Sequence, residues 1–243
     1  MEQKIPKTIH YCWFGGKEKP PIVKKCIASW RKYLVGYEIK EWNEELFDMN
    51  ANQYVQEAFQ AGKFAFVSDY VRVHALYYEG GIYLDTDVEV FKCFDDLLHH
   101  DSFWGFEQEN FIATSTIGAA PGNALIKEFL DSYENKTFLN GDGSFDQLTN
   151  VAIITEMLVK QGLKKNGQQQ TLENLGEFYP QTYFSPYDYI NCRKSITKHT
   201  YSIHYFYKSW LPINSRIKGY MKIALSKIIG GENILRVRKL IQK

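Results

Sequence analysis

The chain has few cysteines, and their placement excludes two classes of small stabilised protein. The four cysteines among its 243 residues, Cys12, Cys26, Cys93 and Cys192, are scattered and show none of the C-x-x-C spacing of zinc or redox sites. We therefore expect reduced thiols that mostly pack in the interior, and neither a disulfide framework nor a zinc site.

Long apolar runs, internal repeats and a strong excess of one charge are also missing. No apolar run approaches the roughly 18–20 residues that a membrane-spanning helix needs, and the chain does not begin with the charged-then-apolar order of a signal peptide. The net charge is only +1, while 44% of the residues are apolar and 16% aromatic. We expect a cytoplasmic protein with one substantial core in a single domain.

Residues 79–90 carry the most informative pattern. Two glycines lead into an alternating run that would place Tyr83, Asp85, Asp87 and Glu89 on one face of a strand. The two aspartates would then lie roughly 6.6 Å apart along that strand and repel each other. A divalent cation with bound phosphate would turn this repulsion into a binding site. The alternative is an ordinary solvated strand face.

A helix is predicted directly before this run, over residues 63–79, because apolar residues recur there at three- and four-residue spacing and two glycines follow. Asp69 and Arg72 share one face of it. Alone they would form a helical ion pair worth a few tenths of a kcal/mol. Beside the two aspartates of the next strand, they offer acceptors for hydroxyls and a forked cation for phosphate or sugar oxygens, which suits a nucleotide sugar.

Further elements alternate along the chain, which indicates a mainly parallel sheet covered on both faces. The predicted strands are residues 5–14, 37–42, 102–106 and 111–118, and the predicted helices are residues 20–34, 43–49, 51–62, 121–133 and 146–161. The helix over residues 43–49 is predicted because Asn43 is a suitable N-cap. In such folds, ligands bind beyond the carboxyl ends of the strands.

Three separated segments together resemble family 32 glycosyltransferases. They are Ile-Pro-Lys-Thr-Ile-His-Tyr-Cys-Trp-Phe-Gly-Gly at 5–16, Ser-Asp-x-x-Arg at 68–72 with Gly-Gly-x-Tyr-x-Asp-x-Asp-Val at 80–88, and His-Tyr-Phe-Tyr-Lys-Ser-Trp at 204–210. This family includes yeast-type mannosyltransferases, bacterial capsular-polysaccharide transferases and, more distantly, clostridial glucosylating toxins. The resemblance implies an α/β fold of GT-A type, a Rossmann-like mixed, mainly parallel sheet flanked by helices, in residues 1–211.

The resemblance also implies roles on the donor side. Trp13 would stack on a nucleobase, although a core tryptophan is an equally good interpretation of the sequence alone. Asp69 and Arg72 would hold hydroxyls of the transferred sugar, and Tyr83 would line the same pocket.

A metal site is implied as well. Asp87 would bind Mn²⁺ or Mg²⁺ directly, and Asp85 would contact sugar or ribose hydroxyls and a metal-bound water. His204 is either a further ligand or a structural histidine. Ser209 and Trp210 would close over the diphosphate. Together with Arg72, the two aspartates are the candidate catalytic residues.

The expected activity is metal-dependent transfer of a hexose or N-acetylhexosamine from a nucleotide-diphospho-sugar. A UDP-sugar is the favoured donor and a GDP-sugar the second candidate. The acceptor would be a saccharide or a lipid-linked saccharide in surface polysaccharide synthesis, and the resemblance implies retention of configuration. A metal-dependent nucleotide-sugar hydrolase or phosphoesterase and a non-catalytic nucleotide-sugar-binding module are the alternatives. Glu107, Glu109 and Asp146 could reach the acceptor, but the pattern selects none of them as a base.

Residues 212–243 form a separate, basic segment. Eight lysines and arginines there stand against Glu232 alone, and apolar residues recur at helical spacing. Such a helical tail either packs on its own domain or lies on an anionic membrane surface, which would make the protein peripheral at the inner face of the plasma membrane. Nucleic acid is not expected, because no aromatic stacking platforms interleave with the basic residues.

Overall fold

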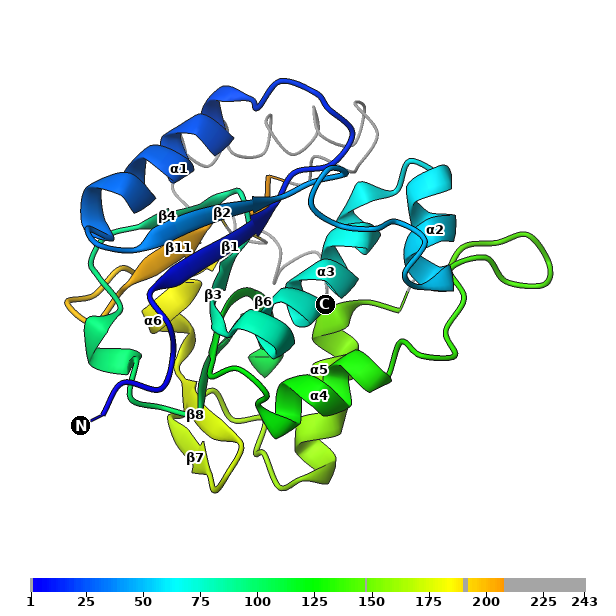
Figure 1. Cartoon of the computed structure of the whole chain (residues 1–243). Helices are drawn as coiled ribbons and strands as arrows, with labels where there is room; N and C mark the ends of the chain where they lie inside the picture. The colour runs from blue at the N-terminus through cyan, green and yellow to red at the C-terminus, as the bar shows by residue number, and fades with distance from the viewer. Residues whose placement is uncertain (1, 147, 190–191, 208–243) are drawn as a thin grey trace, which may run out of the picture.

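The computed structural model describes residues 2–146, 148–189 and 192–207 (Figure 1). The strands are β1 (Thr8–Cys12), β2 (Glu38–Trp42), β3 (Gly81–Leu84), β4 (Val88–Val90), β5 (Ser102–Phe106), β6 (Ile112–Ala119), β7 (Gln170–Leu172), β8 (Gly176–Tyr179), β9 (Tyr187–Asp188), β10 (Arg193–Lys194) and β11 (Ser202–His204). The helices are α1 (Pro21–Tyr33), α2 (Gln53–Gln60), α3 (Phe64–Glu79), α4 (Ala124–Asp131), α5 (Asn150–Lys160) and α6 (Gln181–Phe184), with 3₁₀ turns η1 (Asp95–Leu97) and η2 (Gln108–Asn110).

Seven strands form one mixed sheet in the order β2-β1-β3-β6-β5-β8-β7. β1 runs parallel to β2 and β3, and β5 runs parallel to β8. β6 is antiparallel to both of its neighbours, β3 and β5, and β7 is antiparallel to β8. It follows that β1, β3 and β5 point the same way, and their carboxyl ends meet at one edge of the sheet.

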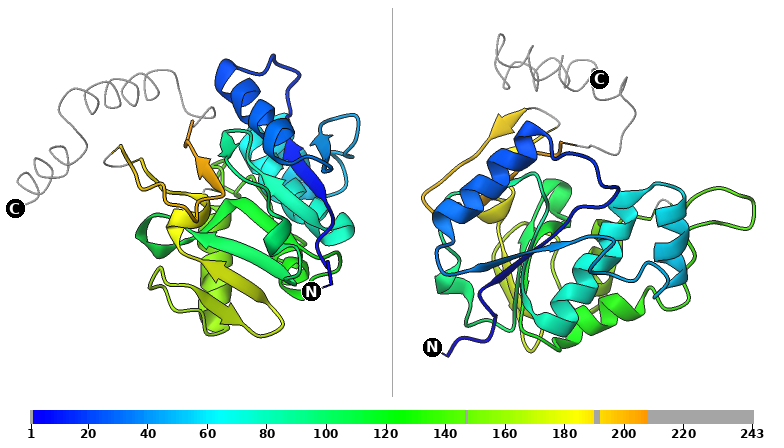
Figure 2. Two further views of the ribbon diagram at one scale, coloured as in Figure 1. Left: turned by 90° about the vertical axis from the view of Figure 1, so that its left-hand side faces the viewer. Right: turned by 45° about the horizontal axis from the view of Figure 1, so that its top comes forward.

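Helices cover both faces of this sheet, as the sequence predicted. α1 packs with β4, η1 and α6 in a hydrophobic cluster on one face, and α2–α5 pack in a second cluster on the other (Figures 1 and 2). The chain is therefore a three-layer α/β structure over its described part. No helix among the described residues is long and apolar enough to cross a membrane.

Local sequence signals explain where several helices begin. Pro21 opens α1 at the position where a missing N–H costs nothing. The Asn52, Asn123 and Thr149 side chains cap α2, α4 and α5 by accepting hydrogen bonds from backbone N–H groups. Since Thr149 is the cap, α5 begins at Asn150 and not at residue 146 as predicted.

The predicted short helix over residues 43–49 is wrong. The Asn43 side chain accepts hydrogen bonds from the backbone N–H groups of Glu45 and Leu46 at 3.1 and 3.2 Å, and the chain there forms consecutive turns. An asparagine side chain that bonds to the backbone two and three residues on stabilises a turn as readily as a helix start.

The continuous acidic strand predicted over residues 82–90 is also wrong. β3 ends at Leu84, and a turn follows in which the Val88 N–H donates to the Asp85 carbonyl oxygen at 2.9 Å. The chain then leaves the large sheet, and β4 pairs with β11 in an antiparallel ribbon. The aspartates therefore lie on a turn between two sheets and not on one straight strand.

Candidate active site

A cavity of about 340 Å³ lies at the edge where β1, β3 and β5 end. Its wall combines the residues after these strands with one face of α3, the start of β6, the N-terminus of α5 and the end of β11. Segments from the beginning, middle and end of the described chain thus meet around one space. The three motifs of the sequence analysis all contribute to it.

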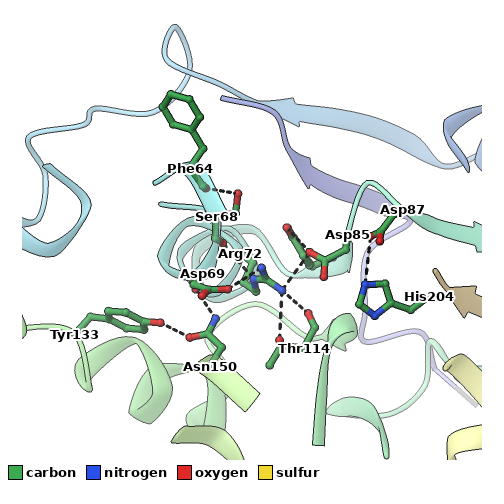
Figure 3. Close-up of polar contacts among 11 residues, drawn as sticks. Phe64, Ser68, Asp69, Arg72, Asp85, Asp87, Thr114, Tyr133, Asn150 and His204 are labelled. Carbon is green, nitrogen blue, oxygen red and sulfur yellow. Dashed lines mark hydrogen bonds and ion pairs between the residues drawn. The ribbon is translucent and has the colours of Figure 1, made fainter. Parts of the chain in front are cut away.

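Arg72 is the central residue on the α3 side of this cavity (Figure 3). Its guanidinium forms ion pairs with Asp69 at 2.8 Å and Asp85 at 3.2 Å, and it donates to the Thr114 carbonyl oxygen at 2.8 Å. It also lies 4.6 Å from the centre of the Tyr83 ring. Only 6% of the Arg72 side chain is exposed, so these contacts fix it in a single position.

The charged groups around Arg72 shift one another's pKa values. Burial by itself would lower the pKa of Arg72, but Asp85 and its other neighbours raise it above its ordinary value, so the guanidinium stays charged. Burial raises the pKa of Asp69 to about 6, although Arg72 opposes the shift. Tyr83, which is fully buried, donates its hydroxyl to Asp85 at 3.1 Å. The Tyr83 hydroxyl group thus holds the Asp85 carboxylate in position.

The first residue of α5, Asn150, holds the backbone of Asp69. Asn150 donates from Nδ2 to the Asp69 carbonyl oxygen at 2.9 Å, and the Tyr133 hydroxyl donates to Asn150 Oδ1 (Figure 3). The predicted sugar-binding pair therefore rests on a buried polar chain that reaches from α3 to the residues after α4.

The β4–β11 ribbon places His204 beside Asp87. In its register His204 lies opposite Val88, and His204 Nε2 is 3.3 Å from Asp87 Oδ1. Asp87 also accepts a hydrogen bond from the Tyr207 N–H at 2.7 Å. Burial alone would raise the pKa of Asp87, but His204 and this N–H lower it overall. The charge of Asp87 outweighs burial at His204 and raises the histidine pKa to about 9.

Asp85, Asp87 and His204 form a cluster that can hold a divalent cation. One ligand atom from each lies within 4.8 Å of the other two. Two carboxylates and an imidazole suit Mn²⁺ and related cations. The buried Nδ1 of His204 has no hydrogen-bond partner among the described residues, which is consistent with a group that completes its contacts when ligand is present.

Trp13 lies directly after β1, in the wall of the cavity, and is partly exposed. Its ring nitrogen donates to the Lys17 carbonyl oxygen at 2.7 Å, and Lys19 Nζ lies 5.5 Å from the ring centre. The partly buried ring also packs against the hydrophobic cluster that contains Trp30 and Val88, so part of the core interpretation holds. Stacking on a base stays a prediction.

Not all predicted residues can be placed. Ser209, Trp210 and the basic segment 212–243 lie outside the described residues. Asp146 pairs with Lys136 at 2.8 Å and does not line the cavity, whereas Glu107, directly after β5, does. The sequence did contain a signal for Glu107, since it follows a strand that ends at the same edge as β3.

The cysteines match the expectation from their spacing in part, since two of the four pack in the interior. Cys12, Cys26, Cys93 and Cys192 are all free, and the first two are buried. Cys12 lies at the end of β1 in the cavity wall, where burial raises its thiol pKa to about 12. This thiol is therefore a packing group and a poor nucleophile.

Residues 20–104, which contain Asp85 and Asp87, match the family model described as a glycosyltransferase sugar-binding region containing a DXD motif. This part of the chain is similar to the sugar-binding region of DXD glycosyltransferases. The matched residues include α1, β2, α2, α3, β3 and the turn that carries both aspartates. Trp13 and His204 lie outside the matched residues, and only the fold brings them to the same cavity as Asp85 and Asp87.

Two curated proteins are similar in sequence. The chain is 26% identical over 169 residues to "Subversion of eukaryotic traffic protein A" of Legionella pneumophila, covering 55% of this chain and 26% of that protein. It is 36% identical over 81 residues to "Glucan organizing enzyme 1" of Cryptococcus neoformans, covering 29% of this chain and 22% of that protein. The chain thus spans about a quarter of the length of these curated relatives.

A solved structure described as "PaToxG Glycosyltransferase" has a similar fold. The two structures superpose with a TM-score of 0.50 at 19% sequence identity. The superposed part covers 66% of this chain and 70% of the other chain. The likeness confirms the predicted fold class, a mixed α/β sheet flanked by helices in the manner of glycosyltransferases.

Proposed function

We propose that the protein transfers a hexose or N-acetylhexosamine from a nucleotide-diphospho-sugar, with a UDP-sugar favoured over a GDP-sugar, to a saccharide or lipid-linked acceptor in surface polysaccharide synthesis. The observation that carries the proposal is that ligand atoms of Asp85, Asp87 and His204 lie within 4.8 Å of one another. They lie in the same cavity as the Asp69–Arg72 pair. Retention of configuration at the sugar C1 belongs to this proposal through the family resemblance.

The charge of the cavity supports a cation-dependent donor. Four carboxyl groups line it, from Asp69, Asp85, Asp87 and Glu107, against the one guanidinium of Arg72 and the imidazole of His204. A diphosphate would be repelled by this surplus of carboxylates unless a divalent cation bound with it. An ordinary solvated acidic face would not enclose its carboxylates in this way.

Each group has a proposed task. Asp85, Asp87 and His204 would hold Mn²⁺ or Mg²⁺, and the imidazole favours Mn²⁺. The cation, when bound, neutralises the charge that develops on the departing diphosphate. Asp69 accepts hydrogen bonds from sugar hydroxyls, and Arg72 fixes the positions of Asp69 and Asp85 through its two ion pairs.

The remaining donor and acceptor contacts come from both ends of the chain. Trp13 is proposed to stack on the nucleobase, and Ser209 with Trp210 to close over the diphosphate. The basic segment 212–243 is proposed to bring the enzyme to anionic lipid at the inner face of the plasma membrane, where a lipid-linked acceptor would lie.

The test is release of the nucleoside diphosphate from a panel of UDP- and GDP-sugars with and without Mn²⁺. We expect cleavage of at least one donor that needs the cation, and a loss of at least about 100-fold in Asp87→Ala because a ligand of the cation is gone. Asp142→Ala removes a carboxylate that is exposed in a loop outside the cavity, and it should leave the rate unchanged.

Thermal unfolding supplies a readout that does not depend on turnover. Mn²⁺ should raise the Tm of the wild type and not that of Asp87→Ala, because only a folded site binds the cation. Cleavage of simple phosphate esters without binding of any nucleotide sugar would instead identify a phosphoesterase. Binding of a nucleotide sugar without cleavage or transfer to any acceptor would identify a binding module.

A further inference from the structure

Glu107 differs from the other carboxyl groups that line the cavity in that its side chain has no hydrogen-bond or ion-pair partner among the described residues. Asp69 and Asp85 are paired with Arg72, and Asp87 is held by His204 and the Tyr207 N–H. For the Glu107 side chain, the described part of the chain provides neither a hydrogen bond nor an ion pair. Its lone pairs are therefore available to a ligand, whereas those of the aspartates are partly committed.

The backbone around Glu107 is nevertheless fixed. Its N–H donates to the Phe111 carbonyl oxygen at 2.7 Å, and its carbonyl oxygen accepts from the Asn110 N–H at 3.2 Å. These bonds close the β5–β6 connection, with Glu107 directly after β5. The residue therefore sits on a rigid support at the same edge of the sheet as Asp85, which directly follows β3.

Its surroundings show that the carboxyl group belongs to the active cavity. Burial raises the pKa of Glu107 to about 7, and the charges of His204 and Asp85 act on it in opposite directions. A partly buried carboxyl group that lines a cavity and has no partner among the described residues commonly marks a functional position. Its uncommitted oxygen atoms can accept the proton of a hydroxyl group that binds beside them.

We propose that Glu107 contacts the attacking hydroxyl of the acceptor and receives its proton. This inference rests on the proposed function. The acceptor oxygen bonds to the sugar C1 on the face that the diphosphate leaves, which retains the configuration. The bond from C1 to the diphosphate oxygen breaks in this step, and its electron pair stays on the diphosphate. The hydroxyl proton passes to the Glu107 carboxylate. The acceptor is thus a hydroxyl compound that binds in the cavity beside Glu107 and the Asp85–Asp87 turn.

The decisive experiment compares the wild type with Glu107→Gln, which keeps the size of the side chain and removes the base. With Mn²⁺ and the nucleotide sugar that the wild type cleaves, the turnover rate should fall at least about 100-fold, within the usual range for loss of a general base. The Kd of the same nucleotide sugar, measured by calorimetry, should stay within about twofold. Glu173→Gln, which removes an exposed carboxylate outside the cavity, should change neither.

Glu107→Asp guards against a purely structural effect. It keeps a carboxylate on a side chain one methylene shorter, so its rate should lie clearly above that of Glu107→Gln. A rate of Glu107→Gln within threefold of the wild type would overturn the inference, and so would equal rates of the two variants or a Kd that rises in step with the loss of rate. If the wild type itself cleaves no nucleotide sugar, the proposed function fails, and this outcome is distinct from an effect of Glu107.

Discussion

Arg72 shows how one side chain organises the candidate site. A helix of this sequence places Asp69 and Arg72 on one face, but the ion pair with Asp85 and the bond to the Thr114 carbonyl oxygen exist only because β3 and β6 lie beside α3. With two carboxylates and a carbonyl oxygen around it, Arg72 is a structural support and a local counter-charge at once.

Replacing Arg72 by methionine should destabilise the fold strongly. The change leaves Asp69 and Asp85 without their buried counter-ion, which typically costs about 3–5 kcal/mol. Urea unfolding at pH 7 measures the loss. Lys127→Met is the matched control, because it breaks an exposed helical ion pair with Asp131 and should cost less than about 1 kcal/mol. Equal losses in the two variants would contradict the role given to Arg72.

Trp13 supplies a second prediction for a single residue. If its partly exposed ring stacks on the base of the donor, Trp13→Ala should weaken nucleotide affinity by about one to two orders of magnitude. Titration calorimetry with UDP and Mn²⁺ measures this. Trp13→Phe keeps an aromatic face and should lose much less. An unchanged Kd in the alanine variant would refute stacking.

At the scale of elements, the connection from α3 through β3 to the Asp85–Asp87 turn decides the site. α3 ends at Gly80, and β3 begins at Gly81 with a φ of 103°, a conformation that residues with a side chain avoid. A Cβ at Gly81 would lie 2.6 Å from the Thr8 carbonyl oxygen on β1. The close approach of β1 and β3 therefore requires glycine. The same approach brings the residues that follow the two strands, Trp13 and Asp85, to one cavity.

Gly81→Ala should accordingly destabilise the protein more than a glycine replacement elsewhere. Gly36 also has a positive φ, of 83°, but a Cβ there would meet nothing within 4 Å. Gly36→Ala should cost about 1–2 kcal/mol from backbone strain alone. Gly81→Ala adds a backbone clash, so its free energy of unfolding should fall by about 2 kcal/mol more. Chemical denaturation of both variants tests this, and similar losses would show that β1 and β3 can separate.

At the scale of the whole molecule, buried histidines tie stability to pH. His10, fully buried on β1, lies 2.7 Å from the Gly80 carbonyl oxygen through Nε2 and accepts from Trp42 Nε1 at 3.1 Å through Nδ1. This arrangement requires the neutral ring. Burial lowers the pKa of His10 below its ordinary 6.5, although Gly80 and Glu79 oppose the shift.

The sign of the pH dependence follows from that lowered pKa. Below pH 6.5 the unfolded chain takes up a proton at His10 that the folded chain refuses, so the stability held above pH 6.5 declines as the pH falls. The slope from one histidine is at most about 1.4 kcal/mol per pH unit. His10→Gln should therefore lose less stability than the wild type between pH 7.5 and 5.5 in urea unfolding. His74 and His100, whose pKa values burial also lowers, are common to both proteins. An identical decline in both would refute the role of His10.

The sequence by itself determined the order of most helices and strands up to residue 161, the sheet edge at which the cavity lies and the candidate residues on both sides of the DXD motif. Period-two and helical spacing are local properties. The spacing within a segment such as α3 is therefore visible in its own residues, without any contact to the rest of the chain. Only the tertiary structure decided which of these residues contact one another. The turn after Leu84, the position of His204 beside Asp87 and the unpartnered carboxyl of Glu107 depend on segments up to 120 residues apart, as the hydrogen bond between Tyr207 and Asp87 shows. Such contacts are fixed by packing across the sheet, which no local pattern encodes.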